Sequence, residues 1–245
     1  MRKFLICAFA AILPVAACAA DVTVSAAASL TNAFRELAQS FEAAHPGDRV
    51  LLNFAASDPL VQQIAKGAPV DVFASADQET MDKADALKLV AVGTRQDFVG
   101  NTVVLIVPAA SAFRPAGLAD LRTAQRLTTG NPASVPIGRY TKEALMKAEV
   151  WQQLEAKFVY GASVRQSLDY VARGEVDAGF VYATDVMAQK DKVRAVLTVP
   201  TTTPVRYPIA VLAGAPQPAL ARSFVQHALS PAGQAILARY GFARP

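Results

Sequence analysis

Two serines follow short runs of alanine, and each lies just before a segment that can start a helix. Ser29 lies in AAASLT (26–31), and Ser57 lies in FAASDP (54–59). Serine is a good helix N-cap, which is the structural interpretation of either residue alone. The functional interpretation is an anion site, because small alanines let a ligand approach the free N–H groups at a helix N-terminus. Two such junctions close together in the chain favour the anion site.

Catalytic chemistry has little support in the residues. The two histidines, His45 and His227, belong to no metal or catalytic motif. The sequence contains no HExxH, no GxSxG and no GxxxxGK[ST] phosphate-binding loop. No base accompanies Ser29 or Ser57 to activate it as a nucleophile. We therefore expect that the chain is not an enzyme and that it carries no cofactor.

The first residues differ in character from the rest of the chain. Arg2 and Lys3 precede an apolar run over 4–17, and small residues follow at 17–20. The run is too short to span a bilayer comfortably. The pattern predicts a secretory signal peptide over 1–20, and hence a mature protein in the periplasm.

Both cysteines of the chain, Cys7 and Cys18, lie in this leader. A disulfide framework and a cysteine metal site are therefore excluded. The run VAAC (15–18) leaves open a lipid anchor at Cys18. We favour simple cleavage near Ala20, because a leucine in place of Val15 would be the stronger lipoprotein signal.

The charge of the chain gives no sign of a nucleic-acid partner. The chain has 24 Lys and Arg against 20 Asp and Glu, and two of the basic residues belong to the leader. The others are scattered along the sequence, and aromatic and basic residues do not alternate in a stripe. We expect no nucleic-acid binding.

The segments that must position the two serines alternate between strand and helix patterns. Strands are expected over 22–25, 50–54, 70–74, 102–107, 127–129, 157–160, 177–182, 193–199 and 207–213. Helices are expected over 30–41, 59–67, 78–87, 141–148, 163–173, 218–229 and 231–240. This alternation predicts an α/β fold with right-handed βαβ units and mostly parallel sheets.

The number of expected strands fits two α/β lobes better than one. The proline-bracketed stretches 108–115 and 200–208 are natural places for the chain to pass between lobes. We predict lobe 1 over 21–107 plus 204–245 and lobe 2 over 108–203. Ligands of open α/β sheets bind beyond the carboxyl ends of the strands, where Ser29 and Ser57 are expected.

The order of motifs along the chain resembles the periplasmic molybdate-binding proteins of ABC importers. The matching motifs are AAASLT (26–31), FAAS (54–57), QQIAKGAPVDVFASADQETMDKA (62–84), GNTVVLIVP (100–108), GNPASVPIGRYTKEAL (130–145), DAGFVYATD (177–185), RYPIAV (206–211) and SPAGQAILARYGF (230–242). They cover essentially the whole mature chain. The resemblance implies the two-lobed type II periplasmic-binding-protein fold, in which each lobe is a mostly parallel sheet flanked by helices and the ligand lies in the cleft between them.

The resemblance also implies a ligand site and its partners. Ser29 and Ser57 would bind the oxyanion through hydroxyl and backbone N–H, Ile137 and Val164 through backbone N–H, and Tyr182 through its phenol. The ligand would be molybdate or tungstate, delivered to a membrane permease with its ATPase, and we expect a monomer. A shell made only of donors suits a fully deprotonated dianion and disfavours phosphate, which retains a proton. Sulfate or another tetrahedral oxyanion stays open as the alternative.

Asp58 departs from this pattern, because some members of the family carry serine or glycine there. A carboxylate about 6 Å from the anion costs ~0.7 kcal/mol per unit charge in water and ~3 kcal/mol at an effective dielectric of about 20. Asp58 either caps its own helix or pairs with Arg139, and we hypothesise that the two form a latch across the cleft. An amino-acid receptor using Arg139 and Asp58 is the remaining alternative.

Overall fold

The computed structural model describes residues 20–245. The predicted signal peptide and both cysteines lie outside the described residues, apart from Ala20. Among the described residues, no helix has both the length and the apolar character needed to cross a membrane.

The strands form two separate five-stranded sheets. The first contains β2 (Arg49–Ala55), β1 (Asp21–Ala27), β3 (Val72–Ala74), β10 (Val205–Val211) and β4 (Gln96–Asn101), in that order. The second contains β7 (Phe158–Gly161), β6 (Leu127–Gly130), β8 (Ala178–Tyr182), β5 (Val103–Pro108) and β9 (Val193–Val199). In each sheet one strand, β10 or β5, runs antiparallel to both of its neighbours. The predicted two-lobed α/β fold with mostly parallel sheets is confirmed.

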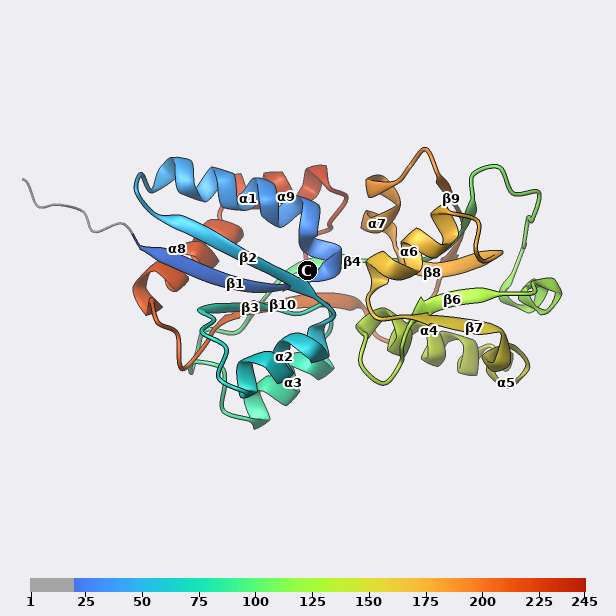
Figure 1. The fold of residues 1–245 in the computed structure, drawn as a ribbon, viewed down its shortest axis with the longest axis horizontal. Helices are drawn as coiled ribbons and strands as arrows, with labels where there is room; N and C mark the ends of the chain where they lie inside the picture. Colours follow the sequence, from blue (N-terminus) through green and yellow to red (C-terminus); the bar gives the residue numbers. More distant parts are fainter. Residues whose placement is uncertain (1–19) are drawn as a thin grey trace, which may run out of the picture.

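Helices cover both faces of each sheet and complete two lobes that lie side by side (Figure 1). Lobe 1 has α1 (Thr31–Ala44), α8 (Pro218–Leu229) and α9 (Pro231–Arg239) on one face and α2 (Ser57–Ala65) and α3 (Gln78–Ala86) on the other. Lobe 2 has α6 (Val164–Ala172) and α7 (Ala183–Ala188) on one face and α4 (Pro136–Lys147) and α5 (Trp151–Leu154) on the other. Three short 3-10 helices lie at 28–30, 118–123 and 155–157.

The lobe boundary predicted after residue 107 is wrong. Strand β5 pairs with β8 and β9, so residues 103–107 belong to the second sheet. The chain passes from the first sheet to the second at Thr102, and it returns over 200–204, between β9 and β10. An apolar run identifies a buried strand, but it does not say which of two sheets the strand joins.

Several predicted helix bounds also need correction. Helix α2 begins at Ser57, after the N-cap Ala56, so Asp58 lies in its first turn and does not cap it. Helix α4 begins at Pro136, five residues before the predicted start. Strand β4 and the short helices α5 and α7 were not predicted. The β4 sequence QDFVGN is rich in residues that are rare in strands, and the two helices are too short to show a helical period.

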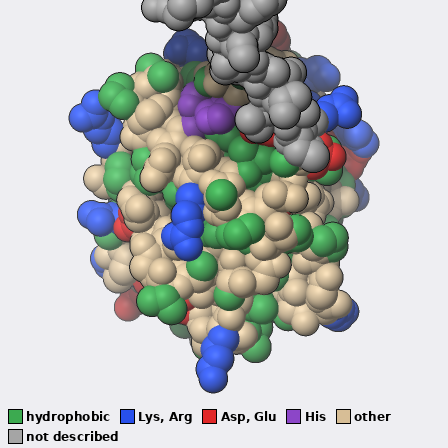
Figure 2. All heavy atoms as spheres, turned by 90° about the vertical axis from the view of Figure 1, so that its left-hand side faces the viewer, with side chains coloured by type: hydrophobic (Ala, Val, Ile, Leu, Met, Phe, Trp, Pro, Cys, Tyr) green, Lys and Arg blue, Asp and Glu red, His purple; other side chains and the backbone are tan. Residues whose placement is uncertain are grey.

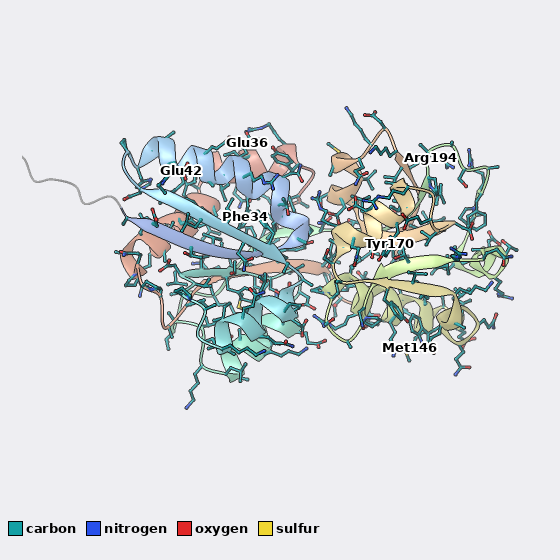
Figure 3. The ribbon with its side chains drawn as sticks, viewed as in Figure 1. Phe34, Glu36, Glu42, Met146, Tyr170 and Arg194 are labelled. Carbon is teal, nitrogen blue, oxygen red and sulfur yellow. The ribbon has the colours of Figure 1, made fainter. Side chains whose placement is uncertain are left out.

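The predicted apolar stripe of α1 forms the centre of the lobe 1 core. Leu30, which precedes the helix, and Phe34, Leu37 and Phe41 within it are all fully buried. The ring of Phe34 lies 5.8 Å from that of Phe98, and Figure 3 shows Phe34 between α1 and the sheet. Each such side chain stabilises the fold by about 1.5–3 kcal/mol through burial. This packing holds α1, and the segment before it, against the end of β1.

The outer end of lobe 1, far from lobe 2, carries hydrophobic side chains scattered among polar atoms (Figure 2). Lys and Arg side chains on this face are separated from one another. Isolated apolar residues on a surface are ordinary and need no partner to explain them.

Candidate functional site

The carboxyl ends of the parallel strands meet where the two lobes face each other. In lobe 1, Ala27 at the end of β1 pairs with Ala55 at the end of β2. In lobe 2, Gly130 at the end of β6 pairs with Gly161 at the end of β7. Chain segments that leave these strands therefore emerge side by side, and each leads within a few residues into a helix.

The two predicted serines lie at this edge of lobe 1. Ser57 is the first residue of α2, and Ser29 lies in the 3-10 turn between β1 and α1. Both side chains are buried. The first N–H groups of a helix have no acceptor within the helix, so the N-terminus of α2 offers free donors beside Ser57.

Lobe 2 presents two further helix N-termini to the same space. Ile137 is the second residue of α4, after Pro136, and Val164 is the first residue of α6. Gly138 lets α4 approach the end of β6, because a Cβ atom there would lie 2.1 Å from the carbonyl oxygen of Gly130. The side chains of Ile137 and Val164 are buried in the core, so both predicted roles, packing and a backbone donor, are compatible.

These residues line one cavity between the lobes. It is narrow, with a volume of about 10 Å³, and is lined by Ala27, Ala28, Ser29, Ala56, Ser57, Ala76, Val135, Pro136, Ile137, Val164 and Tyr182. All five residues predicted to bind the oxyanion are among them. The alanines keep the cavity open beside the backbone, and none of the lining side chains carries a formal charge.

Two of the three hydroxyl groups in the cavity are set to donate into it. The N–H of Ala76 donates to Ser57 Oγ at 3.1 Å, which leaves the serine proton free for another acceptor. Tyr182 is 1% exposed, and its hydroxyl has no hydrogen-bond partner among the described residues. Burial raises the pKa of Tyr182 well above its ordinary value, so the phenol stays protonated. A buried donor without a partner indicates that a ligand completes the site.

The third hydroxyl, that of Ser29, lies 2.9 Å from the hydroxyl of Tyr207 on β10. Tyr207 is fully buried and also accepts a hydrogen bond from Asn101 Nδ2 at 3.3 Å. Neither Tyr207 nor Asn101 was predicted as a site residue. Both lie in motifs that the sequence showed, RYPIAV and GNTVVLIVP, but nothing local in those motifs indicates that their side chains reach Ser29.

Arg139 of lobe 2 contacts carboxylates of lobe 1 on one side of the cavity. Its Nη2 lies 2.7 Å from Asp58 Oδ2 and 2.6 Å from Asp77 Oδ2, and it donates to Thr80 Oγ1 at 2.7 Å. Burial by itself raises the pKa of Asp58, but hydrogen bonds from Lys83 and Arg139 outweigh it and hold the pKa below the ordinary value. The structure thus brings Asp58 and Arg139 together, and Asp77, which was not predicted, shares the arginine.

Arg165 of lobe 2 reaches lobe 1 on the other side of the cavity. It donates to Asn32 Oδ1 at 2.9 Å and to the carbonyl oxygen of Ser29 at 3.3 Å. Its Nε lies 2.8 Å from Asp185 Oδ1, a charge contact rather than an aligned hydrogen bond. Asp185 is fully buried and accepts a hydrogen bond from the N–H of Tyr182 at 3.2 Å. The cluster contacts the backbone of Ser29 and Tyr182, two of the predicted ligand residues, and no motif in the sequence indicated it.

The fold and the cavity define a class of protein: a two-lobed solute-binding protein with a small uncharged cavity between its lobes. Residues 22–243 match the family of bacterial extracellular solute-binding proteins, and the chain belongs to that family. The prediction that the chain is not an enzyme agrees with this membership.

Relatives support the resemblance predicted from the motifs. The molybdate-binding protein ModA of Haemophilus influenzae is 36% identical over 232 residues, which cover 92% of this chain and 91% of the relative. ModA of Escherichia coli K12 is 39% identical over 229 residues, covering 90% of this chain and 88% of the relative. The structure of the periplasmic molybdate-binding protein of Azotobacter vinelandii, at 22% identity, has the same fold, with a TM-score of 0.79 over 91% of this chain and 99% of the other.

Proposed function

We propose that this protein captures molybdate, and also tungstate, in the cavity between its lobes and delivers it to the membrane permease of an ABC importer. The observation that carries the proposal is the set of neutral donors that converge there. Ser29, Ser57 and Tyr182, which carry hydroxyl groups, line one small cavity together with Ile137 and Val164 in the first turns of α4 and α6. The Tyr182 hydroxyl has no partner among the described residues until a ligand accepts from it.

Neutral donors suit a tetrahedral dianion for a physical reason. Molybdate carries four acceptor oxygens and no proton at neutral pH, so every contact from the protein can be a donor. Each hydrogen bond to a charged group contributes roughly 1.5–3 kcal/mol. The ends of α2, α4 and α6 add the positive field of a helix N-terminus without a formal charge. Phosphate keeps a proton at this pH, and that proton would be buried without an acceptor.

The arginines beside the cavity do not take the place of these donors. Arg139 is held by Asp58 and Asp77, and Arg165 is held by Asp185. Each cation is therefore matched by a carboxylate, and neither residue lines the cavity. The same pairing argues against an amino-acid ligand, which would need a free arginine for its carboxylate and a free carboxylate for its amine.

Delivery to an importer is proposed from the relatives, whose names describe molybdate binding. A signal peptide over 1–20 would bring the mature protein to the periplasm. There it would act as a monomer, and both of its lobes can face a permease with its ATPase. Growth of a deletion strain at limiting molybdate, with and without this gene, tests the transport role. Growth that depends on the gene is expected, and growth that does not depend on it would contradict import.

Calorimetry of the mature protein with molybdate, tungstate, sulfate and phosphate tests the ligand. We expect similar tight binding of molybdate and tungstate and much weaker binding of phosphate. The triple variant Ser29→Ala, Ser57→Ala, Tyr182→Phe should lose at least a hundredfold in affinity, since three charged hydrogen bonds are removed. Tighter binding of sulfate than of molybdate would favour the alternative receptor, and undiminished molybdate binding by the triple variant would reject the site.

A further inference from the structure

A row of three polar side chains leads from the boundary between the lobes to the cavity. Asn101 ends strand β4, Tyr207 lies on β10, and Ser29 lies at the cavity. The amide Nδ2 of Asn101 lies 3.3 Å from the Tyr207 hydroxyl, which lies 2.9 Å from Ser29 Oγ. The direction of these hydrogen bonds decides whether Ser29 can donate to a ligand, accept from it, or do both.

The orientation of the Asn101 amide determines the direction of the first hydrogen bond, between Asn101 and Tyr207. The N–H of Thr102 donates to Asn101 Oδ1 at 2.9 Å, so the oxygen of the amide is the atom on that side. The Nδ2 group then faces Tyr207, and it also donates to Thr184 Oγ1 at 2.9 Å. An amide nitrogen donates and does not accept. The Tyr207 oxygen is therefore the acceptor of the first bond.

The direction of the second hydrogen bond, between Tyr207 and Ser29, follows from the burial of Tyr207. Its side chain is fully buried, and burial raises the pKa of Tyr207 well above its ordinary value, so the phenol keeps its proton. A buried hydroxyl proton without an acceptor destabilises the fold, because it loses its hydrogen bond to water and gains none in return. Ser29 Oγ lies at hydrogen-bond distance and is the acceptor available to it. Tyr207 therefore donates to Ser29, and the proton of Ser29 is left to point into the cavity.

We propose that Asn101 and Tyr207 are positioning residues that make Ser29 a donor only, and that they thereby decide the preference of the site for fully deprotonated oxyanions over singly protonated ones. This inference rests on the proposed function. If Ser29 accepted a proton from a ligand, its own proton would be buried without a partner. The row therefore imposes on protonated ligands the cost of an unpaired buried donor.

The other hydroxyls of the cavity cannot compensate for this restriction. Ser57 Oγ already accepts from the N–H of Ala76, so its proton is also directed to the ligand. Tyr182 could turn to accept from a protonated ligand, but its own proton would then have no acceptor among the described residues. Of the three hydroxyls, only Ser29 has its direction set by another side chain, so only there can a side-chain substitution lift the restriction.

The test compares hydrogen phosphate and molybdate as probes on the mature protein at neutral pH. In Asn101→Asp, a side chain of nearly the same shape, the carboxylate accepts the Tyr207 proton. The Tyr207 oxygen can then accept from Ser29, and Ser29 can accept the phosphate proton without leaving its own proton unpaired. We expect the ratio of phosphate to molybdate affinity to rise about tenfold, a change that corresponds to about 1.4 kcal/mol. Tyr240→Phe is a control that removes a tyrosine hydroxyl bond, at 2.8 Å to Glu36, away from the cavity-lining residues. Its ratio should stay at the wild-type value.

Tyr207→Phe provides a second variant. It removes the donor to Ser29 but also the oxygen that could accept the Ser29 proton, so Ser29 stays restricted and the ratio should not rise. The added charge of Asn101→Asp weakens both dianions and leaves the expected rise in the ratio. An unchanged ratio in Asn101→Asp, or an equal rise in Tyr207→Phe, would overturn the proposal. If the wild-type protein binds no tetrahedral oxyanion, the proposed function fails as well. If it binds molybdate but the ratio does not move, only the role of Asn101 and Tyr207 is rejected.

Discussion

Two arginines of lobe 2 reach across to lobe 1 on opposite sides of the cavity, and their partners differ. Arg139 contacts three carboxylates, those of Asp58, Asp77 and Glu79, and all three belong to the other lobe. Arg165 has its carboxylate, Asp185, on its own lobe and crosses only to neutral acceptors. The side chain of Arg139 is 15% exposed and that of Arg165 is 23% exposed, so both pairs are shielded from water.

This difference determines which ion pairs are broken when the lobes separate. The carboxylate of Asp77 loses its cation when the lobes separate, whereas Asp58 keeps Lys83 Nζ at 2.8 Å within its own lobe. The Arg139 cluster therefore couples part of the charge neutralisation to closure. The pair between Arg165 and Asp185 lies within one lobe and does not depend on closure. We therefore retain the hypothesis that Asp58 and Arg139 act as a latch, now shared with Asp77, and assign to Arg165 the support of the Ser29 backbone.

The largest expected effect comes from Arg139→Ala. It leaves Asp77 buried near the anion without a cation, while Asp58 keeps Lys83, and removing one partner of a buried pair costs about 3–5 kcal/mol. Some of this cost is avoided if the lobes stay apart, so we expect molybdate affinity to fall about 150-fold, or about 3 kcal/mol. Calorimetry checks this, with Lys147→Ala on the exposed end of the same helix as control. A loss below threefold would show that the pair does not support closure.

The next largest expected effect is a pH dependence of the free energy of unfolding that Asp185 causes. Burial raises the pKa of Asp185 to about 6, from an ordinary value of 3.8, against the opposing charge of Arg165 and the N–H of Tyr182. Between these values the folded protein holds a proton that the unfolded chain has released, so the free energy of unfolding falls as pH rises through this range. We expect wild type to lose about 2 kcal/mol relative to Asp185→Asn between pH 4 and pH 7.

Urea unfolding of wild type and Asp185→Asn at both pH values measures this difference, because the other carboxyl groups titrate in both proteins and cancel. A gap between the two proteins that is independent of pH would show that Asp185 is ionised throughout the range. Asp58 should behave in the opposite sense, since its pKa is lowered in the folded state. Its contribution to stability is present above its ordinary pKa and is lost as pH falls through the lowered value.

A double-mutant cycle measures the latch itself. Asp58→Ser, Arg139→Ala and the double variant are compared for molybdate affinity, and contacting residues in one network couple by 0.5–3 kcal/mol. We expect about 1.5 kcal/mol, because Asp77 keeps part of the interaction with Arg139 when Asp58 is removed. Strictly additive losses would reject the latch.

The smallest effect is expected for Arg165→Gln. The bonds to Asn32 and to the carbonyl oxygen of Ser29 are lost, but Asp185 can take up a proton, since its pKa is already about 6. We expect a loss of about fivefold in molybdate affinity, or about 1 kcal/mol. Arg173→Gln at the exposed end of the same helix is the control. A loss as large as that of Arg139→Ala would erase the contrast between the two arginines.

Features that depend on neighbours along the chain were predictable. The alanines before Ser29 and Ser57, the proline that opens the helix of Ile137, and the cap Ser163 before Val164 are local signals of strand-to-helix junctions. Together with the order of the motifs, they indicated the fold, and the five expected ligand residues all line one cavity between the lobes. The strand at 103–107 was also predicted from its local apolar pattern. It was assigned to the wrong sheet, because strand pairing depends on segments that are far apart in the sequence.

The sequence by itself determined the class of protein and the residue types of its cavity. Small residues, helix starts and alternating strands and helices can be recognised from residues that are close together in the sequence. Only the tertiary structure decided the partners of Arg139 and Arg165 and the direction of the Ser29 hydroxyl. Tyr207 is 178 residues from Ser29, and Asp77 is 62 residues from Arg139. A hydrogen bond depends on atoms that lie within about 3 Å, and no local pattern records which distant segments the folded chain brings to that distance.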